Sequence, residues 1–149
     1  AAEYYLDFHL TKLIEQNEIL TFGDKHVLFE LSFSEEPPRI KETVFDFFTS
    51  GYKPILAHVE RYPFYIQQWD KIEDYKQRGV LLQLNIASLS GQYGPHVKKM
   101  AEQLIDKGWI DVIGSDCHHH GHLDLLESLR TNPYLHKIAE KPDLLNKQF

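Results

Sequence analysis

Cysteine is nearly missing from this chain, with one among 149 residues. One cysteine cannot form a disulfide within the chain, which excludes disulfide-stabilised folds and fits a reducing compartment, the cytoplasm. Long apolar runs are missing as well. No stretch approaches the roughly 18 apolar residues of a membrane span, and no secretory apolar segment opens the chain. We therefore expect neither membrane insertion nor a signal peptide.

Basic residues are in the minority. The 16 lysines and arginines face 22 aspartates and glutamates, which gives a formal net charge of −6, and no basic cluster stands out. This balance argues against a nucleic acid as partner, because the phosphate backbone is bound mainly by clustered basic side chains. With 42% hydrophobic residues, the chain is long enough for one domain with a real core, and we expect a single domain over residues 1–149.

Four short apolar runs recur along the chain, at 27–33, 54–59, 80–86 and 109–114. Nearly continuous apolar runs of this length are typical of parallel strands that are buried on both faces. Their regular spacing is that of βα units, and right-handed crossovers turn such units into a parallel sheet or barrel. The pattern predicts an α/β fold.

Helical segments separate these runs. The segment 94–108 has apolar residues at helical spacing, with Pro95 suited to its first turn. The segments 38–52 and 69–80 follow the same plan. Gly51, Gly79 and Gly108 come directly before the next strand, where glycine supplies the left-handed residue that ends a helix. A last helix is expected over 123–131, followed by a turn at 132–134 and a polar tail.

Each apolar run carries a polar residue near its end: Glu30, His58, Asn85 and Asp116. Glu3 would be a fifth, if a strand ends there. Parallel α/β folds place their chemistry at the carboxyl ends of their strands. A buried carboxylate or imidazole is costly without a partner. We therefore expect these side chains to converge on one rim.

Carboxylates mixed with imidazole, without thiolate, suit Mn²⁺, Fe²⁺, Zn²⁺ or Mg²⁺, and carboxylates can bridge two cations. Asp116 and His118 are two residues apart, so an extended backbone would point both into one cavity. The alternative is that each polar residue is a hydrogen-bonded structural residue. Four polar residues are unlikely to fall at four strand ends by chance, and this favours the metal hypothesis. We expect His119 and His120, beside His118, to be partly solvated.

A cysteine nucleophile at Cys117 is the competing chemistry. It would need a phosphate-cradling glycine-rich loop and an arginine six positions on, but position 123 is leucine and the loop is missing. If Asp116 and His118 face inward, the Cys117 side chain points the other way. The pattern disfavours a catalytic Cys117.

Arg61 comes three residues after His58 and could clamp a phosphate with two parallel hydrogen bonds. The alternative, equally weighted, is a surface ion pair with Glu60. Tyr62 could flank an aryl substrate, although aromatic residues in such a segment more often serve packing. Asn85 and Ser88 either hydrogen-bond a ligand or brace the rim.

Five segments occur in a specific order: AEYY, LFELSF, ILAHVERY, LQLN and GSDCH. In order and spacing they resemble the bacterial capsule-type (CpsB/YwqE-type) metal-dependent protein-tyrosine phosphatases of the polymerase and histidinol phosphatase (PHP) superfamily. The resemblance covers about residues 1–145. It implies a PHP-type distorted βα barrel with three divalent metals, often manganese, at its rim.

The resemblance also implies roles for single residues. Glu3 corresponds to a carboxylate that bridges two metals, Glu30 and His58 to ligands of the second, Asp116 to a ligand of the first and His118 to a ligand of the third. Arg61 corresponds to an arginine important for activity. The implied substrate is the phosphorylated tyrosine-rich tail of a tyrosine kinase that controls capsule or exopolysaccharide export.

The family pattern begins with a His-x-His strand and further ligands before AEYY, and this sequence does not contain them. We therefore expect an incomplete barrel, the C-terminal two-thirds of the family fold, with fewer than three metals. Its open edge would invite self-association. Two alternatives stay open: another PHP phosphoesterase of histidinol-phosphate type, and an inactive fragment that serves as a phosphate-binding module.

Overall fold

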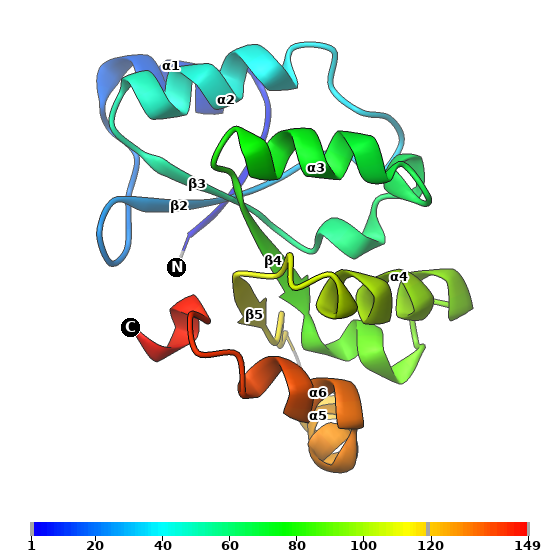
Figure 1. The fold of residues 1–149 in the computed structure, drawn as a ribbon. Helices are drawn as coiled ribbons and strands as arrows, with labels where there is room; N and C mark the ends of the chain where they lie inside the picture. Colours follow the sequence, from blue (N-terminus) through cyan, green and yellow to red (C-terminus); the bar gives the residue numbers. More distant parts are fainter. Residues whose placement is uncertain (1, 119, 149) are drawn as a thin grey trace.

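Five short parallel strands form one sheet whose strand order follows the chain order (Figure 1). The computed structural model describes residues 2–118 and 120–148. The strands are β1 (Glu3–Tyr5), β2 (His26–Glu30), β3 (Lys53–Leu56), β4 (Leu81–Asn85) and β5 (Val112–Gly114). Every neighbouring pair is parallel. Because each strand pairs with the next along the chain, the sheet winds in one direction, as in part of a βα barrel.

Six α-helices are described around this sheet: α1 (Phe8–Gln16), α2 (Ile40–Thr49), α3 (Trp69–Gln77), α4 (Pro95–Asp106), α5 (His120–Ser128) and α6 (Pro133–Ala139). Single 3₁₀ turns lie at Val59–Arg61, Pro63–Tyr65, Ile86–Ser90, Leu129–Thr131 and Leu145–Lys147. Figure 1 shows α1, α2 and α3 along one side of the sheet and both chain ends on the other. No described helix is long and apolar enough to cross a membrane.

The helix ends follow the sequence signals. Asp7 caps α1 by accepting a hydrogen bond from the Leu10 amide at 3.0 Å. Pro95 occupies the first position of α4, as predicted. Gly51 and Gly79 have φ values of 77° and 91°, which confirms their predicted role in reversing the chain between helix and strand.

The core lies between the sheet and the helices. Side chains alternate along β2, so Val27 and Phe29 are fully buried on the helix side, whereas Leu28 and Glu30 point to the other face. Leu82 and Leu84 play the same part in β4. Complete burial of a side chain of this size stabilises the fold by about 1.5–3 kcal/mol. The opposite face carries both apolar side chains, such as Leu28, and polar ones, such as Glu30.

The α/β prediction and the four strand positions are confirmed, but the strands are shorter than the apolar runs. β2 ends at Glu30, since the amide of Leu31 donates to the Tyr62 hydroxyl at 2.9 Å instead of to a strand. β3 ends at Leu56, because His58 has a left-handed backbone with φ 32°. The first residue of the run 109–114 belongs to the end of α4 instead of to β5, because the amide of Trp109 donates to the carbonyl oxygen of Leu104.

The prediction of a polar tail after residue 134 was wrong. Asn132 caps α6 through its side-chain oxygen, which accepts hydrogen bonds from the amides of Tyr134 and Leu135. Ile138 of α6 and Leu144 beyond it are buried. The expected helix at 123–131 begins earlier, as α5, and finishes as a 3₁₀ turn. The segment therefore belongs to the packed domain.

Candidate active site

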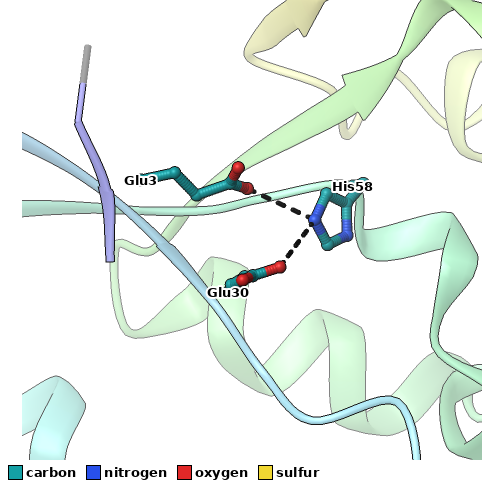
Figure 2. A group of neighbouring side chains, drawn as sticks. All are labelled: Glu3, Glu30 and His58. Atoms are coloured by element: carbon teal, nitrogen blue, oxygen red, sulfur yellow. Dashed lines mark ion pairs between the residues drawn. The ribbon is translucent and has the colours of Figure 1, made fainter. Parts of the chain in front are cut away.

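Side chains from the start of β1, the end of β2 and the turn after β3 meet at one point (Figure 2). The Nε2 atom of His58 lies 3.3 Å from an Oε1 atom of Glu3 and 3.4 Å from an Oε2 atom of Glu30. One ligand atom from each residue falls within 4.8 Å of the other two. Glu3 belongs to β1, Glu30 ends β2, and His58 follows β3. We call this group the Glu3–Glu30–His58 triad.

His58 is buried, and both its backbone and its ring are held by neighbouring side chains. The residue is 3% exposed, and its amide donates to the Gln83 side-chain oxygen at 2.7 Å. The ring of Phe33 stacks on the imidazole, with ring centroids 5.5 Å apart and planes 18° from parallel. These contacts aim Nε2 at the two carboxylates. The other ring nitrogen, Nδ1, is buried without a hydrogen-bond partner among the described residues.

The triad has the donor set of a divalent metal site. It offers one imidazole nitrogen and two carboxylates, which suit Mn²⁺, Fe²⁺, Zn²⁺ or Mg²⁺. The hydrogen bond to His58 lowers the pKa of the Glu3 carboxyl, so this side chain is a carboxylate at neutral pH. Two carboxylates converging on one imidazole nitrogen carry excess negative charge, which a cation would neutralise. The residues present therefore fit a metal ion.

Arg61 lies next to the triad and is fixed on three sides. Its Nη1 atom donates to Asp116 Oδ2 at 3.3 Å. The guanidinium carbon lies 5.0 Å from the centroid of the Phe33 ring and 4.4 Å from that of Tyr93, both cation–π distances. The alternative of a surface ion pair with Glu60 was wrong, because the Glu60 side chain is fully buried. Arg61 keeps a partly exposed side chain that could hold an anion.

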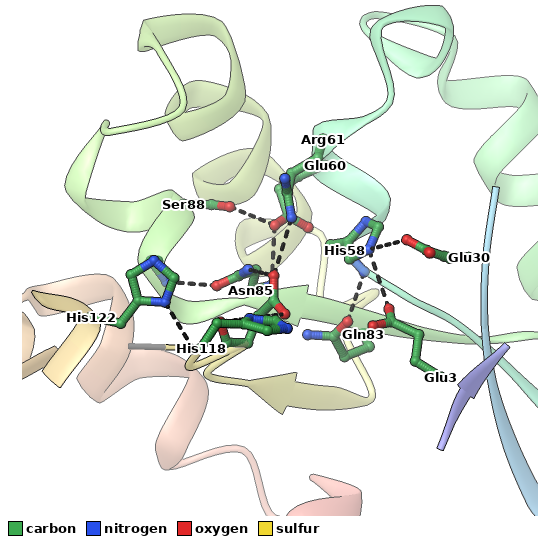
Figure 3. A network of polar contacts seen from close by, with 12 residues as sticks. Glu3, Glu30, His58, Glu60, Arg61, Gln83, Asn85, Ser88, His118 and His122 are labelled. Carbon is green, nitrogen blue, oxygen red and sulfur yellow. Dashed lines mark hydrogen bonds and ion pairs between the residues drawn. The ribbon is translucent and has the colours of Figure 1, made fainter. Parts of the chain in front are cut away.

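Asn85 and Asp116 complete a polar network around Arg61, and Figure 3 labels Asn85 and Arg61 within it. The side-chain amide nitrogen of Asn85 donates to the same Asp116 Oδ2 at 3.2 Å. Asn85 is fully buried, so it braces this rim, which was one of the two alternatives predicted for it. Ser88, the other residue in that prediction, donates to Glu60 at 2.6 Å and also braces.

The expectation of extended backbone from Asp116 to His118 was wrong. Asp116 has φ 48°, which turns the chain, and the His118 side chain is 73% exposed. The Nδ1 atom of His118 lies 2.8 Å from the Asp116 carbonyl oxygen. His118 is thus absent from the triad group, although it stands at the same rim. Cys117 and His120 are exposed, and His119 lies outside the described residues.

Tyr62 serves packing rather than the surface. It is fully buried, and its hydroxyl accepts the hydrogen bond from the Leu31 amide. Its ring contacts Phe33 and Tyr65. Because Tyr62 is fully buried, the structure favours the packing alternative, and the hypothesis that Tyr62 binds substrate by flanking an aryl group was wrong.

Sequence reasoning missed three neighbours of the site: Phe33, Tyr93 and Gln83. Phe33 ends the apolar run 27–33, which predicts a buried strand position, yet it is 42% exposed beside Arg61. Gln83 was hidden within the run 80–86. A polar residue two positions before Asn85, on the same face of the strand, was the available signal.

A cavity of about 350 Å³ opens beside the triad on the face of the sheet away from the helices. Glu3, His58, Gln83 and Asp116 give it a polar end, and its other walls are mainly apolar, from Phe22, Leu28, Ile55, Val112 and Ile113. The size suits a small organic group beside a charged end.

Comparison with known proteins points to one family. The family model for capsular polysaccharide synthesis, CpsB/CapC, matches residues 1–130. A putative tyrosine-protein phosphatase CapC of Staphylococcus aureus is 31% identical over 94 residues, which cover 63% of this chain and 37% of CapC. The tyrosine-protein phosphatase YwqE of Bacillus subtilis is 26% identical over 106 residues, covering 70% of this chain and 42% of YwqE.

A third relative, the tyrosine-protein phosphatase CpsB of Streptococcus pneumoniae, is 25% identical over 123 residues, which cover 78% of this chain and 51% of CpsB. This chain thus spans about half the length, or less, of these relatives. Among solved structures, the work on YwqE and CpsB, described as unique metal-dependent tyrosine phosphatases, contains a chain that matches with a TM-score of 0.75. The match covers all of this chain and 64% of that one at 22% identity, and it shows the same fold.

Proposed function

This chain belongs to the CpsB/CapC family of capsular polysaccharide synthesis, and from that premise we propose that it carries the core of a metal-dependent protein-tyrosine phosphatase. The observation that carries the proposal is the junction of the Glu3–Glu30–His58 triad with Arg61. The ring of Phe33 contacts both His58 and Arg61, so a metal-binding group and an anion-binding group share one wall.

The triad would hold the metal, for which we propose Mn²⁺. When bound, such an ion supplies Lewis-acid stabilisation of phosphoryl oxygens and a reactive water at neutral pH. Asp116 and His118 stand at the same rim and are proposed as ligands of further ions. The three-metal cluster expected from the family resemblance needs ligands in addition to these.

Arg61 would orient the phosphoryl group. Its planar guanidinium can offer two parallel N–H donors to phosphate oxygens, which lysine cannot match. Asp116 holds one edge of the guanidinium, and the rings of Phe33 and Tyr93 hold its faces. Such preorganised donors stabilise the charge that spreads over the phosphoryl oxygens in the transition state.

Phosphotyrosine is the substrate class that fits best. Its phenolate leaving group has an unperturbed pKa of about 10, so the chain need not supply a strong general acid. Two of the relatives named above, YwqE and CpsB, are tyrosine-protein phosphatases. The proposed protein substrate is the phosphorylated tail of a capsule-controlling tyrosine kinase, and the proposed compartment is the cytoplasm, where disulfides are rare.

The test is phosphate release from a phosphotyrosine peptide and from histidinol phosphate, with this chain and Mn²⁺. We expect turnover of the peptide, and loss of that turnover in Arg61→Ala. Faster turnover of histidinol phosphate would favour the other phosphoesterase class. Peptide binding without any turnover would contradict a catalytic role for this chain and support a phosphate-binding module.

A further inference from the structure

Glu60 is a fully buried carboxyl group at the centre of the site, and no role has yet been given to it. Two donors from other segments reach the same oxygen, Oε1: the Ser88 hydroxyl donates at 2.6 Å and the backbone amide of Asn85 at 3.0 Å. The other oxygen, Oε2, is buried without a partner among the described residues. Burying such a group is costly, so its retention at this position calls for an explanation.

The two hydrogen bonds join segments that are far apart in the sequence. Glu60 lies in the 3₁₀ turn Val59–Arg61, directly between His58 and Arg61. Its donors come from the end of β4 and from the following turn, Ile86–Ser90. The carboxyl therefore ties the turn that carries His58 and Arg61 to the next strand of the sheet.

The same two segments are joined a second time, nearer to the solvent. Asn85 donates to Asp116, and Asp116 accepts from Arg61. Glu60, Asn85, Asp116 and Arg61 thus form a closed ring of contacts, with one buried link and one partly exposed link (Figure 3). The exposed link, at 3.3 Å with a side chain 22% exposed, is the weaker of the two, so the buried link must supply most of the rigidity.

We propose that Glu60 is a positioning residue, whose buried carboxyl fixes the turn Val59–Arg61 and thereby places the Arg61 guanidinium beside the triad. The part of this proposal that concerns turnover rests on the proposed function. The part that concerns the placement of Arg61 does not, because it is a statement about the chain alone.

The test follows the Arg61 side chain directly. In a ¹H–¹⁵N spectrum of this chain, the Nε–H signal of Arg61 is assigned by its loss in Arg61→Lys. Ring currents from Phe33 and Tyr93 should shift this signal from its free-arginine position, since the guanidinium lies over both rings. The variants are Glu60→Ala, which removes both hydrogen bonds, Glu60→Gln, which keeps the accepting oxygen, and Ser88→Ala, which removes one bond in case Glu60→Ala fails to fold.

Asp111→Ala is the matched control. Asp111 also ties β4 to another segment, because its carboxylate accepts from the Leu82 amide at 2.8 Å and from the Lys76 ammonium. It lies at the opposite end of β4, away from the triad. A merely structural role of Glu60 predicts that the two alanine variants behave alike.

We expect Glu60→Ala to move the Arg61 signal most of the way to the free-arginine position, Ser88→Ala to move it part of the way, and Glu60→Gln to restore it. In peptide turnover, Glu60→Ala should lower kcat/KM by about 10²-fold, as expected for a displacement of about 1 Å, and Glu60→Gln should recover most of that loss. Asp111→Ala should lower only the unfolding temperature.

An unchanged Arg61 signal in Glu60→Ala and Ser88→Ala would overturn the proposal, and so would an equal shift in Asp111→Ala. Absence of turnover in the unmodified chain would contradict the proposed function alone. The Arg61 signal would then still decide whether Glu60 positions that side chain.

Discussion

The imidazole of His58 and the carboxylate of Glu3 lie 3.3 Å apart although their strands, β3 and β1, are separated by β2. Side chains therefore reach across the width of an intervening strand to meet. This arrangement requires a curved sheet, in which side chains on one face of alternate strands approach one another, as they do in a barrel. The curvature brings the triad together.

Removing one carboxylate should abolish tight metal binding. We expect Glu30→Gln to weaken Mn²⁺ binding by about 10²-fold or more, beyond the 10–100-fold cost of changes in the outer shell of a metal site. Calorimetric titration measures it. Glu35→Gln, which removes an exposed carboxylate nearby, serves as control. Equal affinities for the two variants would contradict a metal site at the triad.

Arg61→Lys should keep the charge and lose the paired donors. We expect kcat for a phosphotyrosine peptide to fall by about 10²-fold, the typical cost of one missing transition-state donor. Arg78→Lys is the control, because Arg78 pairs with Asp74, a partly exposed residue of α3 away from the triad. Full activity of Arg61→Lys would show that a point charge is enough at this position.

Phe33 is expected to matter for the site more than for stability. It is 42% exposed, so Phe33→Ala should cost little unfolding free energy. It removes one of the two rings beside Arg61, worth about 0.5–1 kcal/mol, or a two- to fivefold loss in kcat/KM. Phe45→Ala, on an exposed helix position, is the control for surface effects. A larger stability loss than in Phe45→Ala, without a kinetic effect, would argue against this role.

Gly114 leaves room for the residue that holds His58. A Cβ atom at position 114 would lie 2.6 Å from the Gln83 Nε2 atom, so Gly114→Ala must displace the Gln83 amide from the His58 backbone. We expect Mn²⁺ affinity to fall by about tenfold, as for other outer-shell changes. In a Gln83→Ala background the same substitution should have no further effect. If the losses of Mn²⁺ affinity in the two single variants add up in the double variant, Gly114→Ala does not act through Gln83.

Alkaline pH should unfold this protein through its buried tyrosines. Burial raises the pKa values of Tyr62, Tyr65 and Tyr75 above their usual range. Above about pH 10 the unfolded chain loses these protons and the folded chain keeps them, so the free energy of unfolding falls by about 1.4 kcal/mol per pH unit for each tyrosine. Below that pH these groups cause no change.

Tyr65→Phe tests this directly. The substitution removes one of the three titrating phenol groups. The fall of the unfolding free energy with pH above about pH 10, measured by urea unfolding, should therefore become shallower by about 1.4 kcal/mol per pH unit. Phe29→Leu, another core variant, should lower stability by the same amount at every pH. An alkaline slope that is identical in Tyr65→Phe and the unmodified chain would contradict the prediction.

Much of the fold could be predicted because it rests on local patterns. The apolar runs located four strands, and Gly51 and Gly79 marked the ends of helices. The strand ends were harder to predict. Nothing in the sequence signals that His58 and Asp116, which are not glycines, take left-handed backbones, since surrounding contacts impose these conformations.

The candidate site shows the same division. Polar residues at strand ends stand out in an apolar pattern, so Glu30, His58 and Arg61 could be found without the structure. Glu60 could not, because charged residues are rarely fully buried and its donors lie 25 and 28 positions away. Long-range contacts of this kind depend on the curvature of the sheet.

The edge strand β1 has only three residues, yet it carries one member of the triad. Short edge strands open locally at a lower free energy than the rest of a domain. Each opening of β1 would withdraw Glu3 and leave Glu30 and His58 in place. A cation held by all three would oppose that opening by RT ln(1 + [L]/Kd). Hydrogen exchange at the β1 amides should therefore slow as the site fills, so that the flexibility of this edge reports on the occupancy of the triad.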